Sequence, residues 1–188
     1  MPLRVRVLPV IFTFVVGAAV VRADWTAVAS TGTIDEGDLG KIVLNNDGSA
    51  AIRSTISSTS AKVRFNVTAV TGIEPPPPGA ISGGLVFAMR FRDNGAGARV
   101  IATLKRVTLE GFHFSRPQST DVLGTIDSDL VAPSNGWQTA WSQNANWKVL
   151  TNGLSFLDYG YVVEVQLIKH DATGDPGIMG VQLFRDET

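Results

Sequence analysis

Hydrophobic and polar residues alternate with a period of two along much of this chain. Residues 62–70 show the pattern best, because Val63, Phe65, Val67 and Ala69 fall on one side of an extended segment whose other side is polar. Such alternation predicts β-strands that bury one face. Residues 161–169 are apolar on both sides, which indicates a strand deep inside a sheet. No window beyond the N-terminal segment has the 3.6-residue period of a helix.

Clusters of glycine, asparagine, aspartate and proline separate these segments and predict turns. Three of them predict hairpins, at residues 45–48, 93–97 and 170–177. The first ends in Asp47-Gly48, which supplies the positive φ that tight turns require. Strand candidates lie at residues 26–30, 41–44, 50–54, 62–70, 85–91, 99–109, 112–115, 122–126, 137–141, 147–151, 161–169 and 178–185. Short strands with turns at such intervals predict an all-β fold, an antiparallel β-sandwich, with the jelly roll as one topology that fits.

The first 23 residues have the layout of a secretory signal peptide. Arg4 and Arg6 precede an apolar run from Val7 to Val21, and Ala23 supplies the small residue at the expected cleavage site. The run is shorter than the roughly 20 residues of a membrane-spanning helix. We therefore expect cleavage after Ala23, a secreted or periplasmic location, and no transmembrane helix in the remaining chain. An uncleaved anchor is the alternative, because Arg22 is unusual beside a cleavage site.

Composition narrows the functional classes for residues 24–188, which we expect to form a single domain. These residues contain 13 basic and 17 acidic side chains, a net charge of −4, which argues against nucleic acid as a partner. The chain has no cysteine, so disulfides and thiolate metal sites are excluded.

Three of the four tryptophans lie within eleven residues and are candidates for a ligand platform. They are Trp137, Trp141 and Trp147, and the first two share a face if the segment is a strand. Exposed, coplanar indole rings stack on sugars and other flat ligands, and the neighbouring amides Gln138, Asn144 and Asn146 suit sugar hydroxyls. The alternative is that these indoles fill one end of the core.

Charge is unevenly distributed along the sequence. Residues 61–116 contain eight basic and three acidic side chains, a net charge of +5, whereas residues 117–188 contain three and nine, a net charge of −6. An anion-binding stripe across neighbouring strands is one interpretation; its residues would be Arg64, Arg90, Arg92 and Arg106. The alternatives are a solvated sheet face and pairing of the basic segment with the acidic one, within the fold or between copies.

No cofactor is predicted, although calcium has two weak candidate sites. One is Asp171 with Asp175, and the other is Asp35 with Glu36 and Asp38, all of which carry the hard oxygen ligands that calcium prefers. Neither group matches the spacing of the twelve-residue calcium loop, and aspartates in turns more often cap backbone amides.

The residues available for catalysis are few. His113 and His170 are the two histidines, and neither lies in a recognisable catalytic motif. Glu110 and Glu164 form one conceivable carboxylate pair for glycoside cleavage.

The sequence therefore predicts an exported, non-catalytic binding or assembly module. Its expected partner is a glycan, recognised through the tryptophan segment, or another protein of the cell envelope. A self-assembling structural subunit that forms homo-oligomers and a secreted glycan-active hydrolase are the two alternatives.

Overall fold

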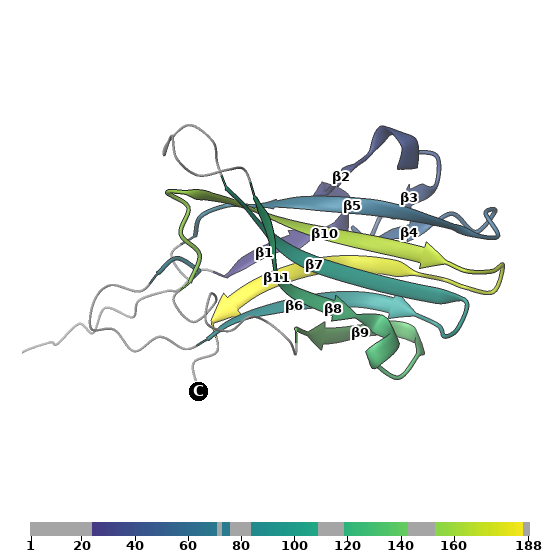
Figure 1. Cartoon of the computed structure of the whole chain (residues 1–188). Coiled ribbons are helices and arrows are strands. Elements are labelled where there is room, and N and C mark those ends of the chain that lie inside the picture. The colour runs from purple at the N-terminus through teal and green to yellow at the C-terminus, as the bar shows by residue number, and fades with distance from the viewer. Residues whose placement is uncertain (1–23, 71–72, 76–83, 109–118, 143–152, 186–188) are drawn as a thin grey trace, which may run out of the picture.

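The protein is an all-β sandwich, and this confirms the fold class expected from the sequence (Figure 1). The computed structural model describes residues 24–70, 73–75, 84–108, 119–142 and 153–185. These residues form eleven strands in two antiparallel sheets. Within the described residues, no helix is long and apolar enough to cross a membrane.

The first sheet has the strand order β3-β4-β11-β6-β9, and β1 also pairs with β11. Its strands are β1 (Trp25–Val28), β3 (Ile42–Leu44), β4 (Ala50–Ile52), β6 (Leu85–Asp93), β9 (Ser134–Trp141) and β11 (Gly177–Arg185). Among the described strands, β9 stands at the end of this sheet.

The second sheet has the order β2-β5-β10-β7-β8. Its strands are β2 (Thr33–Ile34), β5 (Thr59–Val67), β7 (Ala98–Thr108), β8 (Thr120–Asp127) and β10 (Tyr159–Lys169). Three single-turn 3-10 helices lie between strands: η1 (Ala29–Thr31), η2 (Glu36–Asp38) and η3 (Ser128–Leu130).

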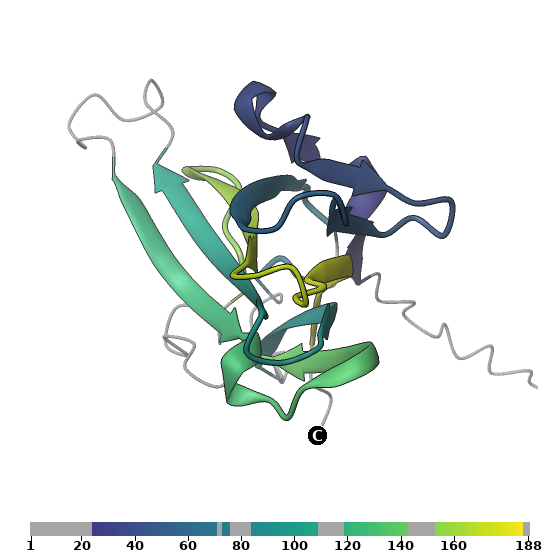
Figure 2. The ribbon, with the colours of Figure 1, turned by 90° about the vertical axis from the view of Figure 1, so that its right-hand side faces the viewer.

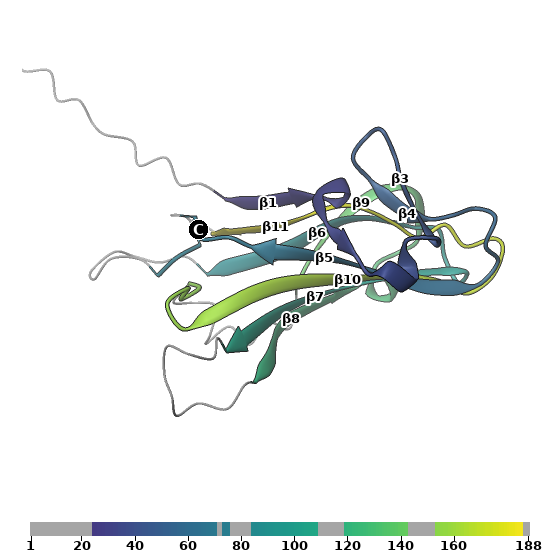
Figure 3. The ribbon, with the colours of Figure 1, turned by 90° about the horizontal axis from the view of Figure 1, so that it is seen from above.

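The core lies between the two sheets and follows from the period of two. Seen from above, β1, β11 and β6 lie in one layer, and β10, β7 and β8 lie in the other (Figure 3). Along most of β5, β6 and β10 every second residue is buried, as Phe87, Met89 and Phe91 of β6 show. The opposing layer contributes Val163 and Val165 of β10, which are fully buried. The hydrophobic faces that the sequence predicts are therefore the inner faces of the sheets.

Only the first of the three predicted hairpins is a hairpin. β3 pairs with β4, and Gly48 in their turn has a φ of 85°, as the Asp-Gly step predicts. The predictions for residues 93–97 and 170–177 are wrong, because each of these segments joins a strand of one sheet to a strand of the other. β6 and β7 belong to different sheets, and so do β10 and β11. Alternation identifies the buried face of a strand, but it does not identify the strand that pairs with it.

These two corner connections pack against each other at one end of the sandwich, the end that faces the viewer in Figure 2. The carbonyl oxygen of Gly97 accepts a hydrogen bond from the backbone N–H of His170 at 2.8 Å. Gly174 lies so close that a Cβ atom at this position would overlap the Gly97 carbonyl. The absence of a side chain at Gly174 therefore lets the two corners meet.

We expect Gly174→Ala to destabilise the protein by about 3 kcal/mol, because relief of the overlap requires movement of backbone rather than of a side chain. Urea unfolding followed by circular dichroism measures the free energy of unfolding. Gly37→Ala is the matched control, because its added Cβ has no neighbour within 4 Å. Equal stability of the two variants would contradict the importance of this contact.

Candidate functional site

The outer side of the first sheet carries the candidate site. Met89 and Phe91 of β6 point into the core, so Ala88, Arg90 and Arg92 project from the opposite face. On β9, the strand next to β6, Trp141 lies opposite Ala88 and Thr139 lies opposite Arg90. We call the outer face formed by Ala88, Arg90, Arg92, Trp137, Thr139 and Trp141 the tryptophan face.

Trp137 is half-buried and rests on a charged side chain of the neighbouring strand. The guanidinium of Arg92 lies over the indole ring, 5.2 Å from its centroid, a cation–π contact. Arg92 Nη2 also donates a hydrogen bond to Asp175 Oδ1 at 2.8 Å. The far edge of the indole reaches Gly177 of β11. Trp137 is thus held in place by its neighbours and covers Arg92.

Trp141 is the exposed indole of the pair, with 55% of its surface accessible. It lines a hollow of about 400 Å³ at the edge of the sandwich, with Thr139 of its own strand and Leu130, which is 78% exposed. We call this the edge hollow. The fourth tryptophan, Trp25, is buried in the core. Trp137 and Trp141 therefore share a face, as the strand pattern predicts, but only Trp141 is largely accessible to solvent.

A second hollow, of about 270 Å³, lies on the other side of Thr139 and crosses β9, β6, β11 and β1. We call it the face hollow. Small residues form its floor, among them Ala88 and Gly180, and polar side chains line it: Thr26, Arg90, Thr139 and Gln182. Thr139 lines both hollows, whereas Trp141 lines the edge hollow. The sequence signal that could have identified Thr139 is its position between the two tryptophans on an alternating strand.

Of the predicted amides, the structure describes Gln138, which contributes little to this face. Gln138 is half-buried and lies opposite the core residue Phe91, with its amide nitrogen donating to the carbonyl oxygen of Ala132 at 2.8 Å. Trp147, Asn144 and Asn146 lie outside the described residues.

The four predicted arginines do not form one stripe. Arg64 and Arg106 belong to the second sheet, whereas Arg90 and Arg92 belong to the first. Arg106 pairs with Asp121 at 2.7 Å and lies over the ring of Tyr159. Strand pairing, which the sequence does not specify, separates the four residues.

The basic and acidic segments pair with each other inside the fold, which confirms one of the alternatives for the uneven charge. The ion pairs that join them are Lys62–Glu164, Arg64–Glu164, Lys105–Glu164, Arg92–Asp175, Arg99–Asp127, Arg99–Asp129 and Arg106–Asp121.

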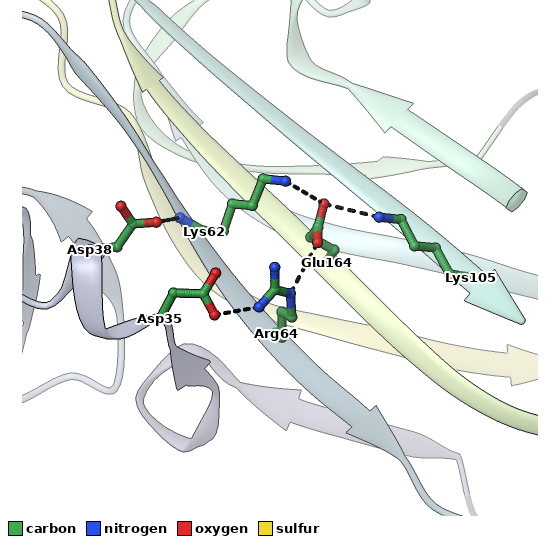
Figure 4. Close-up of polar contacts among 6 residues, drawn as sticks. All are labelled: Asp35, Asp38, Lys62, Arg64, Lys105 and Glu164. Atoms are coloured by element: carbon green, nitrogen blue, oxygen red, sulfur yellow. Dashed lines mark hydrogen bonds and ion pairs between the residues drawn. The ribbon is translucent and has the colours of Figure 1, made fainter. Parts of the chain in front are cut away.

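Glu164 is the centre of the largest of these ion-pair groups, on the outer face of the second sheet (Figure 4). Its carboxylate lies 3.0 Å from the nearest nitrogen of Lys62, Arg64 and Lys105. Arg64 also binds Asp35. Burial raises the pKa of the Glu164 carboxyl, but the hydrogen bonds from the three cations outweigh burial and lower that pKa from 4.5 to about 2.

This environment determines what Glu164 can do chemically. A carboxyl group with a pKa of about 2 is ionised at neutral pH and cannot supply a proton as a general acid. Its hypothetical partner Glu110 lies outside the described residues, as does His113. His170 is exposed in the loop before β11, and its backbone takes part in the corner contact.

The candidate calcium ligands are engaged in turns and ion pairs. Asp171 Oδ1 accepts hydrogen bonds from the backbone N–H and the hydroxyl of Thr173, and Asp38 binds Lys41 at 2.7 Å. Asp35 and Asp175 each pair with an arginine, while Glu36 is exposed. Within the part of the chain that the structure describes, no group of three or more histidine, aspartate or glutamate residues is placed to hold a metal ion.

Comparison with known proteins finds similarity only at the level of structure. No family model and no curated protein matches this chain. A xylan-binding module of carbohydrate-binding family 15 is 13% identical, with a TM-score of 0.46, over 87% of this chain and 97% of the other. A family 61 carbohydrate-binding module, solved with β-1,4-galactotriose, is 14% identical, with a TM-score of 0.43, over 85% and 91%. A family 30 carbohydrate-binding module is 12% identical, with a TM-score of 0.41, over 89% and 86%.

The depressed pKa of Glu164 predicts how stability depends on pH. The group favours the folded state above its unfolded pKa near 4.5, and this contribution is lost as pH falls toward about 2. We expect Glu164→Gln to lower the free energy of unfolding by about 2 kcal/mol at pH 7, and much less at pH 2.5. Urea unfolding at the two pH values measures this difference.

Glu36→Gln is the control for this experiment, because Glu36 is exposed and its side chain has no ion pair among the described residues. Its substitution is expected to change stability by less than about 0.5 kcal/mol at either pH. If Glu164→Gln lowered the free energy of unfolding equally at pH 2.5 and pH 7, packing and not charge would be responsible.

Proposed function

We propose that this protein is a non-catalytic glycan-binding module and that its ligand lies on the tryptophan face. The exposure of Trp141 carries the proposal. This large apolar ring has 55% of its surface in water, and a ligand that covers it is favoured because burial of apolar surface lowers the free energy. The more apolar face of a sugar ring is a natural partner for such a ring, which presents a flat apolar surface.

The surroundings of Trp141 suit a polyhydroxylated ligand better than a purely apolar one. Thr139 and Gln182 offer hydroxyl and amide groups that both donate and accept hydrogen bonds. Trp137 and Trp141 are four residues apart on one strand, so their Cα atoms lie about 13 Å apart. An extended chain of sugars along β9 would contact both indoles and pass over Thr139, which lines both hollows.

Assembly is the second candidate function, and a specific observation favours it. In the described strand orders, β8 and β9 stand at the ends of their sheets, and the exposed apolar side chains Val122, Leu130 and Trp141 lie on or beside them. A second copy that covers this edge would bury the same indole. Sedimentation velocity at several concentrations distinguishes self-association from binding to a glycan.

Export is part of the proposed function, because glycan polymers of the expected kind lie outside the cytoplasm. The support is the arrangement of residues 1–23, with basic, apolar and small residues in the order of a signal peptide.

We expect Trp141→Ala to weaken glycan binding at least about tenfold while the fold remains intact, because the exposed indole supplies stacking area rather than core packing. Trp141→Phe should retain part of the affinity, because it keeps an aromatic face. Affinity electrophoresis in gels that contain neutral and acidic polysaccharides measures the effect, and quenching of tryptophan emission reports whether a glycan protects the ring.

Leu39→Ala is the matched control for this prediction, because Leu39 is also 55% exposed but lies beside η2. The Leu39→Ala variant should bind the glycan with the same affinity as the wild type. Binding that survives Trp141→Ala unchanged would refute the tryptophan face as the ligand site.

We also expect the exported protein to begin at Asp24. Expression of the full chain in a secreting host, followed by intact-mass measurement, should give a product that lacks residues 1–23. Substitution of Ala23 by lysine should block this processing, because the site requires a small residue. A full-length product from the unmodified sequence would favour the uncleaved anchor.

A further inference from the structure

Arg90 differs from most other arginines of the described chain in its contacts. Five of the seven arginines among the described residues hold a carboxylate or a backbone carbonyl: Arg64, Arg92, Arg99, Arg106 and Arg185. Arg90 is exposed, and within the described residues its side chain has no hydrogen bond or ion pair. Arg53, after β4, is the other arginine of this kind.

Arg90 lies in the lining of the face hollow, where its guanidinium could bind an anionic ligand. Arg90 is the one charged residue among the described residues that line the face hollow. Gln182, which also lines this hollow, donates its amide N–H to Asp24 Oδ2 at 3.3 Å. An acidic group that enters the hollow would therefore meet an uncompensated positive charge with hydroxyl groups around it.

Arg90 and Trp141 are close enough to contact the same sugar. Arg90 lies opposite Thr139 in the register of β6 and β9, and Trp141 is two residues farther along β9 on the same face. Arg90 and Trp141 are therefore diagonal neighbours on one face of an antiparallel strand pair. Residues in such positions typically lie about 7–8 Å apart, within reach of long and aromatic side chains. A ring stacked on Trp141 could thus place a substituent against the Arg90 guanidinium.

We propose that the face hollow selects acidic glycans and that Arg90 binds their anionic group. This inference rests on the proposed glycan-binding function. The guanidinium fork matches a carboxylate or a sulfate ester with two parallel N–H···O bonds, whereas neutral sugars offer no charge for it to pair with. Trp141 would supply affinity for a sugar ring, and Arg90 would supply the preference for a charged one.

Matched pairs of polymers test this proposal with the purified protein. Polygalacturonate is compared with its methyl ester, and a sulfated galactan is compared with its desulfated form, so that each pair shares a sugar backbone and differs in whether the anionic group is present. We expect the charged member of a pair to bind about tenfold more tightly, and the pair that shows this difference identifies the anionic group as carboxylate or sulfate. The preference should weaken as sodium chloride rises from about 0.05 M to about 0.5 M.

Two arginine variants separate a local contact from general attraction. Arg90→Gln should weaken binding of the charged polymer to the level of the neutral one and so remove the preference. Arg53→Gln removes another exposed arginine, which has no ion pair among the described residues and does not line the hollow, and it should keep the preference. Arg90→Lys keeps the charge but loses the fork, so its preference should be intermediate.

The remaining outcomes overturn the proposal in distinguishable ways. In one such outcome, the wild-type protein binds charged and neutral polymers equally, while Trp141→Ala binds neither. This result would refute the role of Arg90 and would support the glycan-binding function. If Arg53→Gln and Arg90→Gln lost the preference for the charged polymer equally, the cause would be attraction by the overall charge of the protein. Failure of every polymer to bind would overturn the glycan-binding function itself.

Discussion

Both sheets have to bury one face in the same core, and the rest of the structure depends on this constraint. The two corner connections satisfy it: β6 runs into β7 and β10 into β11 across the core, so the buried side of each strand faces the buried side of the next. The corners themselves meet where Gly97 contacts Gly174. With the inner faces committed to packing, polar chemistry is left to the outer faces, the edges and the loops.

The two outer faces use their charge differently. On the second sheet, Glu164 binds three cations and is ionised down to a pH of about 2, so the charges there satisfy one another. On the first sheet, Arg92 is held between Trp137 and Asp175, but Arg90 has no partner among the described residues. Exposed ion pairs contribute only about 0–1 kcal/mol to stability. An unpaired Arg90 therefore costs the fold little and keeps its full hydrogen-bonding capacity for a ligand.

Sequence patterns predict the strands of this protein well and their partners poorly. Alternation over residues 62–70 and 85–91 identifies strands that the structure confirms, because burial of one face is a local property of the chain. Pairing is not local. The turn at residues 45–48 and the corner at residues 93–97 have similar compositions, yet the first connects neighbours in one sheet and the second crosses the core.

The same distinction applies to the candidate site. The shared face of Trp137 and Trp141 follows from their spacing on one strand and could be predicted. The different environments of Arg64 and Arg90 could not, because they depend on which strand lies alongside: β10 brings Glu164 to Arg64, whereas β11 places Gly180 opposite Arg90. Residues 61–116 thus have a net positive charge in the sequence, but six of their seven described basic side chains form ion pairs in the fold.

Stacking and charge contribute to recognition in different ways, and this determines how the tryptophan face could be specific. An indole accepts the apolar face of almost any sugar ring, so stacking on Trp141 alone would give affinity with little discrimination. Discrimination requires a group that gains a contact from one ligand and not from another. On this face Arg90 would meet that requirement, because its neighbours Ala88 and Gly180 are too small to compete for a ligand and Thr139 is neutral. The diagonal placement of Arg90 and Trp141 would then let one sugar residue supply both contacts, which makes the preference for charge depend on the same ring that provides the affinity.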